Sequence, residues 1–286
     1  MEGCDNFCSY CIVPYTRGPS RSLPAEEIFR ILENPAVASA REIVLTGIHL
    51  GRYGRDLTPV SSLLDLLKAM ENAKANRRIR LSSIEPPEIS PALIAHVKHS
   101  KLVCPHFHVP LQNGDAAILS RMNRHYTPAE FTDIIRAIRQ NLPAAAIGVD
   151  IMVGFPGETE AAFGNTVSLL EALPVTYLHV FPFSPRPGTR AAAFPDPVDP
   201  RIVKKRRDIL LALGREKKSA FYGSMTGKTL DVLIEEERDP RTGLLTGISE
   251  NYVRVLVPGA DTLKNRVVPC RITGPCGKNA VTGVPW

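Results

Sequence analysis

Short apolar runs rich in β-branched residues alternate with longer amphipathic stretches along most of the chain. A short apolar run bounded by turn residues is typical of a buried strand, whereas apolar residues spaced three or four apart are typical of a surface helix. The predicted strands lie at residues 42–47, 78–83, 106–111, 147–155 and 177–183.

Amphipathic helices are predicted between these strands. Two of them begin with proline in the first turn, where the missing backbone N–H costs nothing. A strand and its following helix together have the length of a β–α unit, which favours a parallel sheet covered by helices. The fold class is therefore α/β, with a full or partial barrel of the TIM type. The predicted helices lie at residues 24–34, 61–72, 128–142 and 158–173.

The pattern changes after residue 222. Strand-like runs separated by Gly, Pro and Asp follow, and none of them has a helical period. We therefore predict two domains, an α/β core at residues 1–222 and a small all-β barrel at residues 223–286. A basic helix at residues 199–222 would join them.

Composition indicates an ordinary globular chain. Hydrophobic residues make up 44% and charged residues 22%, and no apolar run is long enough to cross a bilayer, so no membrane partner is expected. The first residues, MEGCDNFCSY, lack the basic and apolar regions of a secretory signal, which favours a cytoplasmic location. The cysteines are then expected to be reduced thiols.

Positive charge is concentrated in one predicted helix. The formal net charge of the chain is +6, and residues 201–218 alone carry eight Lys or Arg against Asp208 and Glu216, a net +6. A basic helix can follow a phosphate backbone, but a solvated helix face is an equally good interpretation. The candidate phosphate contacts on this helix are Lys204, Lys205, Arg206 and Arg207.

Three cysteines near the start of the chain carry the clearest chemistry. Cys4, Cys8 and Cys11 form a C-x3-C-x2-C run, and three thiolates so close in sequence can hold three irons of a 4Fe–4S cluster. The fourth iron stays open, and S-adenosyl-L-methionine can chelate it through its amino and carboxylate groups. Structural zinc needs four ligands and no second pair of cysteines lies nearby, so zinc and unliganded thiols are the weaker alternatives.

Six stretches together resemble the radical S-adenosylmethionine methylthiotransferases, over nearly the whole chain. LTGIHLGRYG and CSYCIVPYTRG are most similar to the branch that modifies threonylcarbamoyladenosine in tRNA; sister branches, acting on isopentenyladenosine in tRNA or on a ribosomal protein, remain alternatives. GKTLDVLIEE and GISENYVRVLV resemble a TRAM domain, a small OB-like barrel that grips polynucleotides. The six stretches are GCDNFCSYCIVPYTRGPSRS, EIVLTGIHLGRYGRDL, RLSSIEP, HFHVPLQNGDAAILSRMNRHYT, DIMVGFPGETEAAF and LHVFPFSPRPGTRAA.

The resemblance implies a partial (β/α)6 barrel that binds a 4Fe–4S cluster and S-adenosyl-L-methionine. It also implies a reducing electron donor and the addition of a methylthio group to carbon 2 of the modified adenine. The partner would be the anticodon loop of tRNA, whose unpaired base leaves the stack at low cost, and not DNA. Because the chemistry would belong to the cofactors, no side chain is predicted to be catalytic.

Family residues carry over to matching positions of this sequence. Tyr10 would lie near the adenine of S-adenosyl-L-methionine. Thr46 and Gly47 would meet its amino group, and Arg124 would pair with its carboxylate. Residues at later strand ends could line the pocket, although a local hydrogen bond or a solvated turn is as good an interpretation for most of them. These strand-end residues are Ser83, Glu85, Gln112 and Asp150.

The remaining candidate RNA contacts lie outside the basic helix. Tyr252 and Arg254 alternate along one predicted strand, so both should share a face on which an unpaired base could stack. A tyrosine in the barrel core is at least as common an arrangement. Arg17 and Lys228 complete the predicted set.

Two features differ from the family pattern. Full-length members carry a preceding domain with three further cysteines; here Cys104, Cys270 and Cys276 are too scattered to replace them, so we expect free thiols. The strand that should lead into Cys4 is also missing, which would leave an unpaired sheet edge beside a fraying loop. We therefore expect a truncated chain, for which an RNA-binding remnant without a working cluster is the alternative function. The sequence predicts no oligomeric state.

Overall fold

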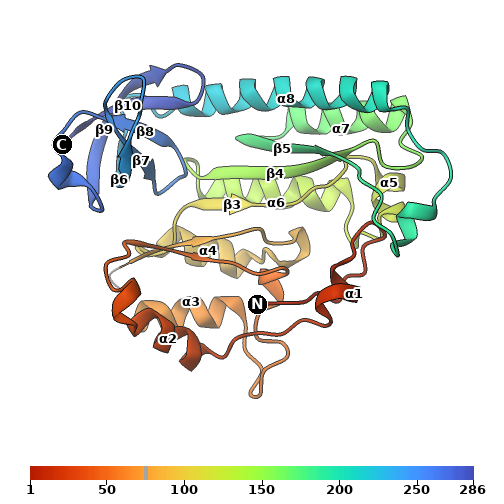
Figure 1. Ribbon diagram of the computed structural model, residues 1–286, viewed down its shortest axis with the longest axis horizontal. Coiled ribbons are helices and arrows are strands. Elements are labelled where there is room, and N and C mark those ends of the chain that lie inside the picture. The colour runs from red at the N-terminus through yellow and green to blue at the C-terminus, as the bar shows by residue number, and fades with distance from the viewer. Residues whose placement is uncertain (74–76) are drawn as a thin grey trace.

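Five parallel strands in the first part of the molecule form a two-stranded and a three-stranded sheet (Figure 1). The computed structural model describes residues 1–73 and 77–286. The strands are β1 (Glu42–Leu45), β2 (Arg78–Leu81), β3 (His106–His108), β4 (Ala146–Val153) and β5 (Tyr177–Pro182). β1 pairs with β2, and β3, β4 and β5 pair in that order. Single bridges connect the two groups. All five predicted strands are present and parallel, which confirms the α/β prediction.

The row of strands has an open edge at β1. Its one hydrogen-bonded neighbour among the described strands is β2, and the side chain of Val44 is half exposed. The unpaired edge expected from the sequence is therefore present. It lies close to the loop that carries Cys4, because the Cys4 thiol meets His49 just beyond β1.

Helices connect the strands and cover one face of the sheet. The described helices are α1 (Val13–Arg17), α2 (Ala25–Glu33), α3 (Leu63–Asn72), α4 (Pro91–His99), α5 (Ala116–Arg121), α6 (Pro128–Asn141), α7 (Glu160–Ala172) and α8 (Pro200–Gly223). Ser62, Ser90 and Thr159 cap α3, α4 and α7 by accepting a backbone N–H of the first turn. Within the two described ranges, no helix combines the length and the apolarity that a bilayer crossing requires.

Residues of β4 alternate between the two faces of the sheet. Ile147, Val149 and Ile151 are fully buried in the main apolar core, with Phe107 of β3 in the same core. The opposite positions form what we call the polar face, where three neighbouring strands place their side chains in register. The polar face consists of His106, His108, Asp150, Tyr177 and His179.

Gly148 makes room for an aromatic ring on the polar face. A Cβ atom at this position would lie 2.1 Å from the ring of Tyr177, so a larger residue would displace that ring. With glycine there, the Tyr177 hydroxyl lies 2.7 Å from Nε2 of His106. Tyr252 from the C-terminal part also stacks on His106, at 4.5 Å between ring centres, and its ring lies 5.8 Å from that of Tyr177.

The C-terminal part is a closed barrel. Its strands are β6 (Thr229–Arg238), β7 (Leu245–Ser249), β8 (Arg254–Val257), β9 (Val267–Cys276) and β10 (Ala280–Pro285), in the order β10-β8-β7-β6-β9. Val232, Val255, Ile272 and Val281 fill its core. The long helix α8 runs along the sheet and leads into this barrel (Figure 1). The predicted small β-barrel is therefore present.

A buried carboxylate organises the contact between the two parts; we call Glu42, Arg78 and Arg80 the arginine clamp. Glu42 accepts hydrogen bonds from Nε and Nη2 of Arg80 at 2.8 and 2.9 Å and also pairs with Arg78. Burial raises the pKa of Glu42, but the hydrogen bonds and charges of the two arginines outweigh it and lower the pKa. The same guanidinium groups donate at 2.8–3.0 Å to four barrel carbonyls, those of Asp231, Ile248, Ser249 and Glu250.

Glu42→Ala should lower the free energy of unfolding by about 3 kcal/mol or more, because it leaves two buried guanidinium groups without a counter-charge. Urea unfolding followed by circular dichroism measures this change. Glu27→Ala is the matched control, since Glu27 pairs with Arg30 on the exposed surface of α2 and such pairs contribute less than about 1 kcal/mol. Equal effects of the two substitutions would contradict the clamp.

Candidate functional site

The three N-terminal cysteines lie on one loop that precedes α1. Cys4, Cys8 and Cys11 are half-buried free thiols. The backbone N–H of Asn6 points to Sγ of Cys4 at 3.5 Å, and the N–H of Cys11 donates to the carbonyl of Cys8 at 3.0 Å. Phe7 takes a positive φ of 47°, which turns the chain between the first two cysteines. The local backbone therefore gathers the three thiols on one loop.

This loop packs on the carboxyl-terminal end of the sheet. The N–H of Ser9 donates to the carbonyl of Met122 at 2.9 Å, and the N–H of Ala191 donates to the carbonyl of Ser9 at 2.7 Å. The ring of Tyr10 meets the ring of Phe155, just after β4, edge-on at 6.5 Å. In β/α barrels the loops at this end form the active face, so the thiols lie at the end of the sheet where a site is expected.

The spacing of the thiols favours a cluster over a zinc ion. Ligands that surround one tetrahedral zinc at about 2.3 Å lie roughly 3.8 Å from each other. Among the described residues, one set of three His, Cys, Asp or Glu ligand atoms lies within 4.8 Å of one another, and it is not the cysteine set. Wider spacing suits a cubane in which each thiolate binds a different iron. The residues present therefore fit the predicted 4Fe–4S cluster.

A buried arginine lies beside the thiols. Burial raises the pKa of Cys8 and Cys11, and Arg124, with Nη1 3.4 Å from Sγ of Cys8, acts in the opposite direction. The free thiols of Cys8 and Cys11 are therefore protonated at neutral pH, and iron binding has to release these protons. Once the thiolates form, the guanidinium group of Arg124 provides a positive charge next to them.

Arg124 also contacts Glu85, another predicted site residue. Its guanidinium group forms an ion pair with Glu85, which follows β2, and Nε donates to the Tyr126 hydroxyl at 3.1 Å. The structure thus brings Glu85 and Arg124 together, although the sequence suggested separate roles for them. An Arg124 that also binds the carboxylate of S-adenosyl-L-methionine would have to share its donors with Glu85, and this contact stays a prediction.

His49 is a site residue that the sequence did not single out. Its Nδ1 lies 3.5 Å from Sγ of Cys4, and its Nε2 lies 2.6 Å from Oε1 of Glu88. Burial lowers the pKa of His49, but its hydrogen bonds with Cys4 and Glu88 outweigh burial and raise the pKa to about 9. The sequence did offer a signal for His49, since it follows the end of β1 by a few residues. Side chains just beyond strand ends line this edge of the sheet.

The remaining cofactor candidates lie at or beyond strand ends. Thr46 and Gly47 directly follow β1, and Ser83 follows β2 and bridges to β3. Gln112 has a positive φ of 64° and is buried, and its N–H donates to the carbonyl of Asp150 at 2.8 Å. Within the described part of the chain, Oε1 of Gln112 has no hydrogen-bond partner, so a bound ligand can donate to it.

Asp150 links these strand ends to the polar face. Nε2 of His108 lies 2.8 Å and Nδ1 of His179 lies 3.4 Å from Oδ1 of Asp150. Burial raises the pKa of Asp150, but the two imidazoles outweigh it and lower the pKa to about 2, so the carboxylate is ionised at neutral pH. These three side chains are the set, within the described residues, that could also hold a metal ion, although both imidazoles already lie at one carboxylate oxygen, Oδ1 of Asp150.

Comparison with known proteins assigns the family. Residues 1–170 match the model of the Radical SAM superfamily. The chain belongs to the radical SAM superfamily. The tRNA-2-methylthio-N(6)-dimethylallyladenosine synthase of Pelotomaculum thermopropionicum is 37% identical over 96% of this chain and 61% of its own length. The threonylcarbamoyladenosine tRNA methylthiotransferase MtaB of Bacillus subtilis is 34% identical over 95% of this chain and 61% of its own length, and the MtaB of Aquifex aeolicus is 37% identical over 89% and 60%.

Solved radical SAM structures share the fold at low sequence identity. The methyltransferase TsrM of Kitasatospora setae, solved with cobalamin and a [4Fe-4S] cluster, has a TM-score of 0.55 at 16% identity, over 66% of this chain and 37% of its own. The coproporphyrinogen III oxidase HemN of Escherichia coli has a TM-score of 0.56 at 16% identity, over 78% of this chain and 52% of its own. Both similarities support a radical SAM domain.

These similarities confirm the resemblance to the radical SAM methylthiotransferases. They also confirm the predicted cofactors, a 4Fe–4S cluster and S-adenosyl-L-methionine. The chain spans about 60% of the length of the curated relatives that it matches. The names of these relatives divide between two modified nucleosides, so sequence identity alone does not choose the substrate.

One predicted RNA contact of this radical SAM chain is corrected by the structure. Arg206 is 4% exposed, and its Nη1 donates to the carbonyl and to Oε2 of Glu158 at 2.9 and 2.8 Å. Its guanidinium group also lies over the ring of Phe163. Arg206 therefore neutralises a buried carboxylate and holds α8 against the loop before α7, and it cannot reach a phosphate.

The other predicted RNA contacts come from separate segments of the chain. Lys204 and Lys205 are exposed near the start of α8, where Arg207 pairs with Asp208. Arg17 is exposed at the end of α1, and Lys228 is exposed just before β6.

Tyr252 and Arg254 do not share a strand as predicted. Tyr252 precedes β8 in a turn with a φ of 64°, and its ring stacks on His106 and lies under the guanidinium group of Arg80 at 5.1 Å. Arg254 begins β8 and is exposed. The turn therefore aims the Tyr252 ring at the polar face of the radical SAM sheet.

Cys8→Ser should abolish cluster binding, because one of the three thiolates is lost. After anaerobic reconstitution, visible absorption and iron analysis should give about four irons per wild-type chain and close to none for the variant. Cys276→Ser is the matched control, since Cys276 is a half-buried thiol at the end of β9, and it should retain the wild-type iron content. A wild-type chain that takes up zinc and no iron would refute the assignment.

Arg206→Ala should lower the free energy of unfolding by about 3 kcal/mol, because it leaves the buried Glu158 without its partner. Affinity for RNA should not change, since Arg206 has no exposed donor. Lys205→Ala, which removes an exposed charge one residue away, should leave the urea midpoint unaltered. Weaker RNA binding by Arg206→Ala with wild-type stability would contradict this role.

Proposed function

We propose that this chain forms the radical SAM core and the RNA-gripping barrel of a tRNA methylthiotransferase that acts on threonylcarbamoyladenosine beside the anticodon. The choice of threonylcarbamoyladenosine as the substrate rests on the polar face, which presents Asp150, His108 and His179 below the strand ends. Family membership and the names of the relatives support the class of reaction.

The cysteine loop would hold the cluster, and two neighbouring cationic side chains would lie beside it. Cys4, Cys8 and Cys11 supply the thiolates, and His49 and Arg124 place positive charge beside two of them. When bound, the cluster and S-adenosyl-L-methionine supply an adenosyl radical that removes a hydrogen atom from the substrate. An external reductant has to supply the electron.

Strand-end residues would orient S-adenosyl-L-methionine. Tyr10 and Phe155 offer an apolar surface to its adenine, and Gln112 offers an unpaired acceptor for its donors. Residues on the other strand ends complete the proposed pocket: Thr46, Gly47, Ser83, Glu85, Arg124 and Asp150. These residues bind and position the cofactor, and none of them is required to react.

The chemistry of the polar face matches a polar substituent on the adenine. A threonylcarbamoyl group carries a carboxylate, a hydroxyl and N–H donors, whereas a dimethylallyl group is hydrocarbon only. Asp150 can accept from the donors, and the exposed imidazole of His179 can donate to the carboxylate. A dimethylallyl group would cover the ionised Asp150 without offering it a hydrogen bond, which is costly.

The C-terminal barrel would bind RNA in the manner of a TRAM domain. We place the domain boundary as the sequence suggests, with the radical SAM core at residues 1–222 and the barrel at residues 223–286. The exposed Tyr252 and Arg254 lie where the barrel meets the polar face, and Lys228 lies before its first strand. Binding at this end would present the anticodon loop of a tRNA to the open side of the sheet.

Deuterium transfer tests the proposed function without a sulfur supply. The anaerobically reconstituted chain is mixed with S-adenosyl-L-methionine, dithionite and an anticodon stem-loop RNA deuterated at carbon 2 of the target adenine. Deuterium should appear in deoxyadenosine when the target is threonylcarbamoyladenosine. The rate should be at least about tenfold lower when the target is dimethylallyladenosine, because polar groups of the site then stay unpaired.

A substitution on the polar face separates substrate choice from cofactor binding. His179→Phe should reduce transfer from the threonylcarbamoyl RNA and raise transfer from the dimethylallyl RNA, with an unchanged iron content. His99→Phe, an exposed histidine at the end of α4, is the control and should change neither rate. Equal transfer from both RNAs would overturn the substrate choice. No transfer from either, despite a full iron content, would overturn the enzyme proposal.

A further inference from the structure

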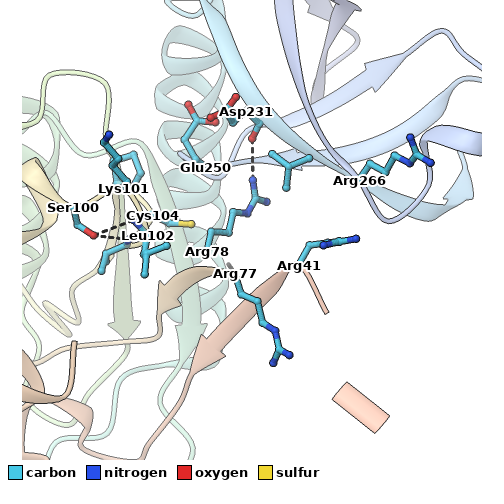
Figure 2. A pocket seen from close by; sticks show the side chains of 13 residues that line it. Arg41, Arg77, Arg78, Ser100, Lys101, Leu102, Cys104, Asp231, Glu250 and Arg266 are labelled. Carbon is cyan, nitrogen blue, oxygen red and sulfur yellow. Dashed lines mark hydrogen bonds between the residues drawn. The ribbon is translucent and has the colours of Figure 1, made fainter. Parts of the chain in front are cut away.

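A basic groove of about 900 Å³ lies between the radical SAM part and the barrel (Figure 2). Its walls come from the segments that lead into β1, β2 and β3 and from the facing side of the barrel. The groove is therefore at the amino-terminal end of the strands, and the cysteine loop is at the other end. Its charged residues are Arg41, Arg77, Arg78, Lys101 and Arg266 against Asp231 and Glu250.

One of the arginines is held in place with donors to spare. Arg41 uses Nε to reach the carbonyl of Asn265 at 3.4 Å, and both of its Nη groups lack a partner within residues 1–73 and 77–286. Arg77 points away from the barrel, and its Nη1 and Nη2 donate to the carbonyls of Leu32 and Ala38 at 2.9 and 3.4 Å (Figure 2). Fixing a guanidinium group in advance lowers the entropy lost when a ligand binds to it.

Two further cations face the groove without a partner. The side chains of Lys101 and Arg266 are exposed, and neither donates a hydrogen bond to another described residue. Figure 2 shows Arg266 on the barrel and Arg41 on the radical SAM part at the open side of the groove, and the Arg41 contact with Asn265 places them next to each other. Arg78 lies deeper and belongs to the arginine clamp.

The acidic residues reduce this charge only in part. Arg41, Lys101 and Arg266 face the carboxyl groups of Asp231 and Glu250, while Arg78 is already paired with Glu42. Burial raises the pKa of Glu250 to about 7, so this carboxyl group is partly neutral near neutral pH. Oε2 of Glu250 has no hydrogen-bond partner in the described part of the chain. The groove therefore offers positive charge at its rim and a free acceptor in its wall.

Building on the proposed function, we propose that this groove binds the phosphate backbone of the substrate RNA, with Arg41, Lys101 and Arg266 as phosphate contacts. Guanidinium forks match phosphate oxygens, and a groove of this volume holds more than one phosphate. The free Glu250 oxygen can accept from a ribose 2′-hydroxyl, a donor that RNA has and DNA lacks.

An RNA strand suits the groove better than an acidic protein segment. The charged rim is shared between the two parts of the molecule, as expected for a backbone that runs across both of them. Single-stranded and stem RNA presents regularly spaced phosphates that can meet cations on both walls. None of the three proposed contacts lies on α8, whose positive charge first suggested RNA binding.

The test measures RNA affinity against salt with the full chain and no cofactor. The probe is a fluorescently labelled anticodon stem-loop hairpin, followed by anisotropy at several KCl concentrations. Lys101→Gln with Arg266→Gln should weaken binding about tenfold at low salt and reduce the salt slope by about two, one for each lost phosphate contact. The matched control is Lys68→Gln with Arg136→Gln, which removes two exposed charges from α3 and α6.

Each outcome decides between the possibilities. Loss in the groove variant alone, with unchanged thermal stability, supports the proposal. Equal loss in the control, or an unchanged salt slope in the groove variant, overturns it. Polyglutamate that displaces the RNA at an equal charge concentration also overturns it, in favour of an acidic protein partner. The binding experiment needs no cluster, so its failure would not bear on the deuterium-transfer experiment. Failure of deuterium transfer would likewise not bear on RNA binding in the groove.

Discussion

The arginine clamp fixes the position of the barrel relative to the strands of the sheet. Arg78 and Arg80 share one carboxylate, that of Glu42, and also donate to barrel carbonyls, so the barrel is held against the amino-terminal ends of the strands. A buried ion pair of this kind adds little net stability compared with apolar packing, but it is costly to break. Its main effect is therefore positional, because directional guanidinium hydrogen bonds hold the barrel at the amino-terminal ends and leave the carboxyl-terminal ends open to the cysteine loop.

Between these two ends, the polar face gives the sheet a continuous hydrophilic surface. It begins where Tyr252 stacks on His106, continues through Tyr177 and ends at Asp150 with its two imidazoles. Gly148 permits this arrangement by leaving space for the tyrosine ring. A substrate base can therefore meet hydrogen-bonding groups along this face, while the apolar residues on the other side of the same strands hold the helices.

The sequence was most informative where the signal is local. All five parallel strands and the cysteine loop follow from short runs of residues, and only the strand ends were misplaced by a few positions. Arg206 could not be assigned correctly, because its partner Glu158 lies 48 residues away and charge alone does not reveal a buried pair. The groove was missed for the same reason, since its cations come from separate segments that only the fold brings together.

The two sets of cations differ in what they can do for a polyanion. Lys204 and Lys205 are exposed on α8 without fixed geometry, so they can attract a polyanion within a screening length of about 8 Å but pay side-chain entropy for any defined contact. Arg41 is already tied to a backbone carbonyl and pays less. Attraction by α8 and the proposed anchoring by the groove are therefore separate tasks, and net charge alone does not distinguish them.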